Sequence, residues 1–302
     1  MAVSLVVVGS GPWAQRHMAT IEKAPNLRLG GVVSESLVGE MRKLAHGIKV
    51  SSVWPSTKSM IDEDYRPDGV VVAVQPPRML ASILPVLDVG IPLFVEKPLG
   101  LSTKEARLMS EHAIRGNVPL MVNFIHLFSI GYRRLRQELS SIGELRRVVA
   151  QGGNQGPDRA YMSALWDYGP HDLAFALDLL GRDPESINAR VICGDRKNHV
   201  VSVEMGFSDG RSANLEFGNQ LLEKVRRLIC YGTDQYLQLD DYPSPALSVS
   251  GEHLPLDVVM TPLEVALQEF ASVTAGAEDS RGTSSLAVRV NECIEEIERS
   301  LW

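Results

Sequence analysis

Short apolar runs recur along the first 122 residues and alternate with stretches of helical pattern. They lie at 3–8, 27–33, 69–74, 91–95 and 119–122 and are rich in Val, Leu and Ile. Polar and apolar positions do not alternate within them, which is typical of parallel strands buried on both faces. The pattern predicts βαβ units wound into one α/β domain with a doubly wound parallel sheet.

The predicted helix that begins after Ser102 carries signals at both ends. Ser102 and Glu105 form a capping box, in which each side chain accepts a hydrogen bond from a free backbone N–H at the helix start. Gly116, which follows Arg115, is a residue that readily takes the left-handed conformation at a helix end. We therefore expect the helix to stop at Gly116.

The pattern changes after residue 122. A predicted helix at 129–140 is followed by β-rich segments at 143–152, 200–218 and 224–240, which follow one another through tight turns. Consecutive strands without helices between them indicate a largely antiparallel sheet. Two further helices are predicted, at about 262–274 and 285–299. We thus predict two domains, an α/β domain at 1–122 and an α+β domain at 123–302.

Composition narrows the class of protein. The chain has 302 residues, 44% of them hydrophobic, and 30 basic against 37 acidic residues give a net charge of -7. This balance argues against binding to nucleic acid or an anionic membrane, which requires clustered positive charge. The first apolar run is too short for a signal peptide or membrane span, so we expect a cytoplasmic protein. The histidines and the three cysteines show no metal-ligand spacing, so no metal site is predicted.

A glycine turn joins the first strand to the first helix. Gly9, Gly11 and Ala14 have GxGxxA spacing between "VSLVVV" and a helical segment. The first glycine permits the tight turn, the second lets the backbone approach a pyrophosphate, and the small third residue lets helix and strand pack closely. An ordinary glycine turn is the alternative. The βαβ context favours dinucleotide binding. Trp13 lies beside this motif, but packing is the more common role for such a residue.

The end of the second apolar run bears on the choice of dinucleotide. An acidic residue there accepts hydrogen bonds from the ribose of NAD, whereas a basic one accommodates the 2'-phosphate of NADP. Ser34 holds the expected position, Glu35 is next, and Arg42 and Lys43 follow. The absence of an acid at Ser34 favours NADP, but Glu35 becomes a ribose ligand if the register shifts by one residue. We therefore expect NAD or NADP.

The fourth of these strands has an unusual end. In "LFVEKPLG", Glu96 and Lys97 follow a buried apolar run directly, and Pro98 stops the pairing. A lysine at the carboxyl end of a parallel strand lies where doubly wound folds bind ligands. A water-exposed ion pair at the strand end is the simpler alternative. Because X-Pro bonds are where cis peptides occur, a cis bond at Lys97–Pro98 is conceivable.

Three segments together resemble one family. "VVVAVQPP", "LFVEKPLG" and "WDYGPHDLAFALDLLG" are similar to the glucose-fructose oxidoreductase, inositol dehydrogenase and MocA (Gfo/Idh/MocA) family of NAD(P)-dependent oxidoreductases, over nearly the whole chain. The resemblance implies an N-terminal Rossmann domain and a C-terminal domain that binds substrate and forms a homodimer or homotetramer through its sheet. It also implies hydride transfer between nicotinamide and a hydroxyl or keto carbon of a sugar, nucleotide sugar or cyclitol.

The resemblance also implies roles for individual residues. The catalytic residues would be Lys97, Asp167 and His171, with the histidine as proton donor or acceptor. Residues in contact with the cofactor would be Gly9, Gly11, Pro12, Trp13, Ala14, Ser34, Glu35, Gln75, Pro76, Glu96 and Lys97. The substrate would contact Lys97, Asn123, His126, Arg159, Tyr161, Asp167 and His171. The family often has arginine where His126 stands, which affects substrate contacts more than hydride chemistry.

The proposed chemistry agrees with the residue types. Oxidation of a secondary alcohol releases a proton, and a histidine accepts it well near neutral pH. Because Pro170 suits a first helical turn, we expect His171 on the opening turn of its helix. The polar segment 151–166 is interpreted as a substrate loop, with Arg159 suited to a carboxylate or phosphate. A non-catalytic dinucleotide sensor is the alternative function, but a sensor would not need all three proton-transfer residues.

One motif is rejected on its context. "GFSDG" at 206–210 matches the GxSxG pattern of hydrolases, in which the nucleophilic serine joins a strand to a helix. Here β-rich segments flank Ser208 on both sides. We therefore interpret it as a β-hairpin turn.

Overall fold

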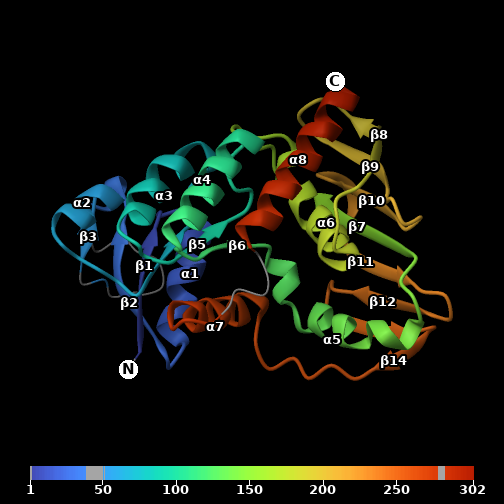
Figure 1. Ribbon diagram of the computed structural model, residues 1–302, viewed down its shortest axis with the longest axis horizontal. Helices are drawn as coiled ribbons and strands as arrows, with labels where there is room; N and C mark the ends of the chain where they lie inside the picture. The colour runs from blue at the N-terminus through green and yellow to red at the C-terminus, as the bar shows by residue number, and fades with distance from the viewer. Residues whose placement is uncertain (1, 39–49, 51, 278–282) are drawn as a thin grey trace. The chain divides into compact units, whose positions relative to one another are not determined.

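The computed structural model describes residues 2–38, 50, 52–277 and 283–302 (Figure 1). Its contacts divide the chain into two compact units. The first contains Met1–Asn123 and Leu263–Val288, and the second contains Phe124–Pro262 and Arg289–Trp302.

A six-stranded parallel sheet forms the centre of the first unit. The strand order is β3-β2-β1-β4-β5-β6, so the chain starts in the middle and winds outward in both directions. The strands are β1 Val3–Val8, β2 Leu27–Val33, β3 Val53–Trp54, β4 Gly69–Val72, β5 Leu93–Glu96 and β6 Leu120–Asn123. The predicted doubly wound sheet is confirmed. The two-residue strand β3 was not predicted, because so short a strand has no hydrophobic pattern of its own.

Helices of the first unit include one that comes from late in the chain. They are α1 Pro12–Lys23, α2 Thr57–Asp62, α3 Met79–Asp88, α4 Thr103–Gly116 and α7 Pro262–Thr274. Phe270 of α7 stacks on Phe94 of β5 with ring centroids 5.5 Å apart. Gly69 makes room for it, since a Cβ there would lie 2.8 Å from the Phe270 ring. The predicted second domain at 123–302 differs from the observed division here, because α7 buries its apolar face in the first unit.

The ends of α4 show one prediction confirmed and one corrected. The Ser102 hydroxyl accepts a hydrogen bond from the Glu105 amide at 3.1 Å, as the capping box predicts. The helix ends at Gly116 as predicted, but the left-handed residue is not Gly116. Gly116 is still helical, and Asn117 takes the left-handed conformation with φ of 50°. Asparagine tolerates this conformation better than most residues with a side chain.

An eight-stranded sheet dominates the second unit. Its order is β14-β13-β12-β11-β7-β10-β9-β8, and β7 with β10 is the parallel pair among these strands. The largely antiparallel sheet is therefore confirmed. The strands are β7 Arg147–Gln155, β8 Ser186–Gly194, β9 His199–Gly206, β10 Ser212–Gly218, β11 Gln220–Tyr231, β12 Tyr236–Asp240, β13 Ala246–Val249 and β14 Glu252–Leu254.

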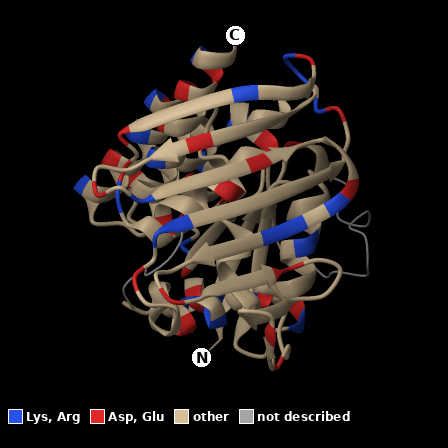
Figure 2. Cartoon of the chain, turned by 90° about the vertical axis from the view of Figure 1, so that its right-hand side faces the viewer, with Lys and Arg blue, Asp and Glu red and all other residues tan. Residues whose placement is uncertain are grey.

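Helices pack against one face of this sheet. Helix α6 (Ala164–Leu180) contacts β7, β9 and β10, and α5 (Ile130–Glu138) contacts β12 and β13. Helix α8 (Ser284–Leu301) ends the chain. Figure 2 shows the opposite face with no helix in front of its strands and with charged residues scattered among uncharged ones. None of the helices among the described residues is long and apolar enough to cross a membrane.

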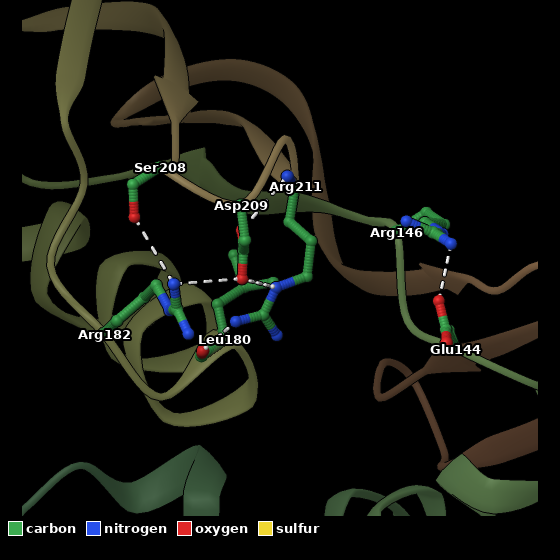
Figure 3. A network of polar contacts seen from close by, with 7 residues as sticks. All are labelled: Glu144, Arg146, Leu180, Arg182, Ser208, Asp209 and Arg211. Carbon is green, nitrogen blue, oxygen red and sulfur yellow. Dashed lines mark hydrogen bonds and ion pairs between the residues drawn. The ribbon is translucent and has the colours of Figure 1, made fainter.

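The "GFSDG" segment is the turn of the β9–β10 hairpin, as predicted. Gly206 pairs with Ser212, and Gly210 has φ of 79°. Asp209 accepts from the guanidinium groups of Arg211 and Arg182, at 2.7 and 3.2 Å, and Ser208 also accepts from Arg182 (Figure 3). Figure 3 also shows the neighbouring ion pair of Glu144 with Arg146. These contacts stabilise the hairpin, and Ser208 lies in its turn.

His199 makes the stability of the second unit depend on pH. Its Nδ1 donates to the Asp195 carbonyl at 2.8 Å, which leaves Nε2 buried without a hydrogen-bond partner among the described residues. Burial lowers the pKa of His199 below the usual 6.5, despite the opposing effect of the Asp195 carbonyl. The unfolded chain therefore takes up this proton first, and stability falls as pH drops below about 6.5.

We expect His199→Gln to reduce this loss of stability between pH 7.5 and 5.5. Urea unfolding at several pH values measures it. His253→Gln is the control, because His253 is exposed. Equal pH slopes for wild type and His199→Gln would contradict the assignment.

Candidate functional site

The turn between β1 and α1 has the geometry of a phosphate-binding turn. Gly9 has φ of 123°, and a Cβ there would lie 2.4 Å from the Ala73 carbonyl oxygen. Gly11 caps α1 without a side-chain hydrogen bond, and a Cβ on it would meet nothing within 4 Å. Ala14 is fully buried against the turn. The space beside Gly11 is therefore open, which would let a pyrophosphate approach the start of α1.

Pro12 and Trp13 form the first turn of α1. Pro12 is the first helical residue, where the missing N–H costs nothing. Trp13 is 38% exposed, and its ring packs under the Arg16 guanidinium, whose carbon lies 4.9 Å from the ring centroid. The cofactor contact of Trp13 stays a prediction.

Three serine hydroxyls form a chain between this turn and the end of β2. The Ser36 hydroxyl lies 3.0 Å from that of Ser10 and 3.0 Å from that of Ser34. Ser34 precedes the short helix η1 (Glu35–Leu37), in which Glu35 is exposed. Arg42 and Lys43, considered above for the cofactor, lie outside the described residues. Hydroxyl groups can donate to a phosphate or to a ribose, so these three serines suit either dinucleotide.

Gln75 and Pro76 lie three and four residues after Val72, the last residue of β4. Gln75 caps the short helix η3 (Pro76–Arg78) and is exposed, whereas Pro76 is buried. This places both at the carboxyl end of a central strand, which is the edge where doubly wound sheets bind ligands.

Glu96 ends β5 in a buried polar network rather than in water. Only 8% of the residue is exposed, and its Oε1 accepts from His17 Nε2 at 2.7 Å and from Asn123 Nδ2 at 2.8 Å. These two hydrogen bonds offset the free-energy cost of burying the carboxylate. The bond between Lys97 and Pro98 is cis. Lys97 is half-buried and follows Glu96, whose carboxylate is held by His17 and Asn123.

The structure gives two residues of this network more definite places. His17, which the sequence alone suggests is structural or at the surface, is fully buried and contacts the Glu96 carboxylate, so its role is structural. Its spacing from Ala14 on the buried face of α1 was the one signal that could have placed it there. Asn123 was predicted to contact substrate, but its side-chain amide points to Glu96 and the residue is 1% exposed.

Asp167 and His171 both lie on α6, but not where the proline pattern suggested. The helix begins at Ala164 after Ser163, so Pro170 lies within it and His171 belongs to its third turn. The prediction that His171 lies on the opening turn is wrong. Proline lacks only one amide donor, and the helix continues through it because its apolar residues are buried along its whole length.

Asp167 is paired with an arginine from the preceding loop. Arg159 Nε donates to Asp167 Oδ2 at 2.9 Å, and Asp167 is 9% exposed. Partial burial opposes the charged form, but the hydrogen bond and charge of Asp167 outweigh it and raise the pKa of Arg159. The loop is shorter than the predicted 151–166, because β7 continues to Gln155 and α6 begins at Ala164. Tyr161 lies half-buried in the same loop.

His171 is packed against a second histidine and stands next to a buried ion pair. The ring of His126, in the short helix η4 (Ile125–Phe128), meets the His171 ring edge-on with centroids 4.8 Å apart. Asp172 is fully buried, and its Oδ2 lies 2.9 Å from Arg226 Nη1. Burial raises the pKa of Asp172 although the Arg226 charge lowers it. The pair crosses β7 at Gly152, where a Cβ would lie 2.2 Å from Arg226 Nη1.

The predicted site residues thus fall into two groups. Glu96, Lys97 and Asn123 belong to the first unit, as do the predicted cofactor residues. His126, Arg159, Tyr161, Asp167 and His171 belong to the second. Within the described ranges, no three His, Cys, Asp or Glu residues are grouped so that they could hold a metal ion.

Comparisons with known proteins agree with this architecture. Residues 3–124 match the model of GFO_IDH_MocA, the oxidoreductase family with an NAD-binding Rossmann fold. The rhizopine catabolism protein MocA of Rhizobium meliloti is 22% identical, over 94% of this chain and 90% of its own length. Inositol 2-dehydrogenase 2 of Saccharopolyspora erythraea is 26% identical, over 77% of this chain and 68% of its own.

A solved structure extends the likeness to the whole chain. UDP-N-acetylglucosamine 3-dehydrogenase GnnA of Acidithiobacillus ferrooxidans superposes with a TM-score of 0.87 at 20% identity, over 100% of this chain and 98% of that one. This likeness concerns the fold of both the parallel and the largely antiparallel sheet. The glycine turn and the "EKP" strand end lie in the part of the chain that matches this oxidoreductase family, residues 3–124, and both sheets are similar in fold to the solved structure.

Proposed function

We propose that this protein transfers a hydride between the nicotinamide of NAD(P) and a hydroxyl or keto carbon of a sugar, nucleotide sugar or cyclitol. The observation that carries the proposal is the network at the end of β5. A buried carboxylate held by His17 and Asn123 precedes Lys97 at the ligand-binding edge of a sheet whose first turn is open for a pyrophosphate. A strand end that only had to be soluble would not need a buried Glu96.

The first unit would hold the cofactor. The amides that follow Gly11 would bind the pyrophosphate, Ser34 or Glu35 the adenosine ribose, and Gln75 and Pro76 the nicotinamide side. The bound nicotinamide supplies or accepts the hydride. Lys97 would stabilise the negative charge that develops on the substrate oxygen.

The second unit would supply the proton transfer. His171 would take the hydroxyl proton during oxidation and return it during reduction. Asp167, fixed by Arg159, would orient substrate hydroxyls as a hydrogen-bond acceptor. His126 and Tyr161 would add substrate contacts.

The substrate class rests on the family and on the polar character of these residues. An inositol dehydrogenase and a UDP-N-acetylglucosamine dehydrogenase are among the proteins similar to this chain. Carboxylate, imidazole and hydroxyl groups suit a substrate with several hydroxyls. We further propose a homodimer or homotetramer formed through the uncovered face of the eight-stranded sheet (Figure 2). Sedimentation measurements would determine the assembly.

Turnover of NADH and NADPH with a panel of keto-sugars, keto-cyclitols and nucleotide sugars tests the function. We expect oxidation of the reduced cofactor with at least one member of the panel. Binding of the cofactor without turnover on any of them would instead favour a dinucleotide sensor. Such a sensor would still bind NAD(P) at the glycine turn, so cofactor titration separates it from a protein that binds no dinucleotide.

A substitution at Ser34 tests the preference for NADP. We expect Ser34→Asp to lower affinity for NADPH by about 10-fold or more relative to NADH, because an added carboxylate repels the 2'-phosphate and accepts from the ribose. Fluorescence titration with each cofactor measures it. Ser141→Asp is the control, since Ser141 is exposed and belongs to the second unit. An unchanged ratio would remove Ser34 from the ribose site.

A further inference from the structure

Asp241 directly follows β12 and lies against His126. Its Oδ2 is 3.5 Å from His126 Nδ1, and its side chain is 10% exposed. The Asp241 amide donates to the Arg226 carbonyl at 2.8 Å, which fixes the position of the backbone on the neighbouring strand β11. A carboxylate held in place and mostly removed from water is a strong acceptor for an imidazole N–H.

His126 stands between Asp241 and His171. Its ring meets the edge of the His171 ring at 4.8 Å between centroids, with an interplanar angle of 80°. Phe175, one turn further along α6, lies 6.2 Å from the His126 ring. The imidazole therefore has a carboxylate at one nitrogen and aromatic rings beside it, and all of these residues belong to the second unit.

We propose that Asp241 is a positioning residue that acts through His126 on His171; this rests on the proposed function, in which His171 transfers the proton. By accepting from Nδ1, Asp241 keeps the proton of His126 on that nitrogen and holds the ring in one orientation. The held ring forms one wall for His171 and limits its rotation. A catalytic side chain held in one rotamer retains its reactive geometry between turnovers.

Kinetics of Asp241→Asn test the proposal. We expect kcat to fall between about 10-fold and 100-fold, as for a displaced catalytic group, while KM for the cofactor stays unchanged. Asp241→Glu should recover part of the loss. Asp240→Asn is the matched control, because Asp240 is the preceding residue but pairs with Arg227 instead. Its kcat should equal that of the wild type.

A double variant shows whether Asp241 acts through His126. His126→Phe keeps an aromatic ring beside His171 but removes both ring nitrogens. If the two residues act as one unit, the double variant is no slower than the slower single variant. Multiplying losses, or an unchanged kcat in Asp241→Asn, would overturn the proposal.

An NMR measurement keeps this proposal separate from the proposed function. Imidazole 15N spectra of the protein without substrate report the tautomer of His126. We expect a proton on Nδ1 in the wild type and a mixture of tautomers in Asp241→Asn. The same spectrum for both proteins would overturn the positioning role even if turnover is found. A changed spectrum with no turnover on any substrate would overturn the proposed function alone.

Discussion

Lys97→Ala and His171→Ala are each expected to lower kcat by about 100-fold to 10,000-fold, the usual range for loss of a proton-transfer or charge-stabilising group. Lys97 stands next to Glu96, whose carboxylate accepts two hydrogen bonds, so the strand end that carries the lysine is fixed in position. His171 stands on a buried helix. Dissociation constants for NAD(P) should change much less than kcat, since the proposed pyrophosphate site is the glycine turn.

Matched surface variants distinguish this effect from general damage. Lys104 and His253 are exposed, so Lys104→Ala and His253→Ala should keep wild-type turnover. Steady-state kinetics with the best substrate of the panel, together with cofactor titration, measure the effects. Undiminished turnover in both Lys97→Ala and His171→Ala would sink the proposed mechanism.

Arg226→Met is expected to destabilise the protein by about 3–5 kcal/mol, the cost of leaving one partner of a buried ion pair without the other. Asp172 is fully buried and Arg226 is 8% exposed, so water cannot replace the lost guanidinium. The pKa of Asp172, already raised by burial, should rise further when the positive charge is removed. Loss of Arg226 also leaves Asp172, the residue next to His171, without its ion-pair partner.

Denaturant unfolding measures the stability of Arg226→Met and of two further variants that serve as comparisons. Arg227 is the neighbouring residue and forms an exposed pair with Asp240, so Arg227→Met should cost at most about 1 kcal/mol. Replacing both partners, as Asp172→Leu with Arg226→Met, should recover much of the stability, because no unpaired charge stays buried. An Arg226→Met protein as stable as the Arg227→Met protein would show that the pair contributes little.

Hydrophobic pattern predicted the two sheets because each kind of strand leaves its own trace. β1 and β4 are buried on both faces and read as unbroken apolar runs, whereas β10 alternates buried and half-buried residues. The hairpin at Ser208 followed from the same reasoning. The start of α6 was placed wrongly because Pro170 resembled a helix start, while burial of the whole helix overrode that local preference.

Contacts between residues far apart in the sequence could not be predicted from the hydrophobic pattern. Phe270 joins the first unit although it stands 147 positions after Asn123, the end of β6. The network of His17, Glu96 and Asn123 unites three residues from α1, β5 and β6. Local propensity depends on neighbours in the chain, and these partners meet only when the sheet is assembled.

The sequence by itself determined the fold class, the glycine turn and the motifs around Lys97 and His171, because each depends on residues within a few positions of one another. Only the tertiary structure decided that Glu96 is buried between His17 and Asn123, and that Asp241 stands behind His126. A hydrogen bond needs two atoms about 3 Å apart, and residues distant in sequence reach that separation only through packing.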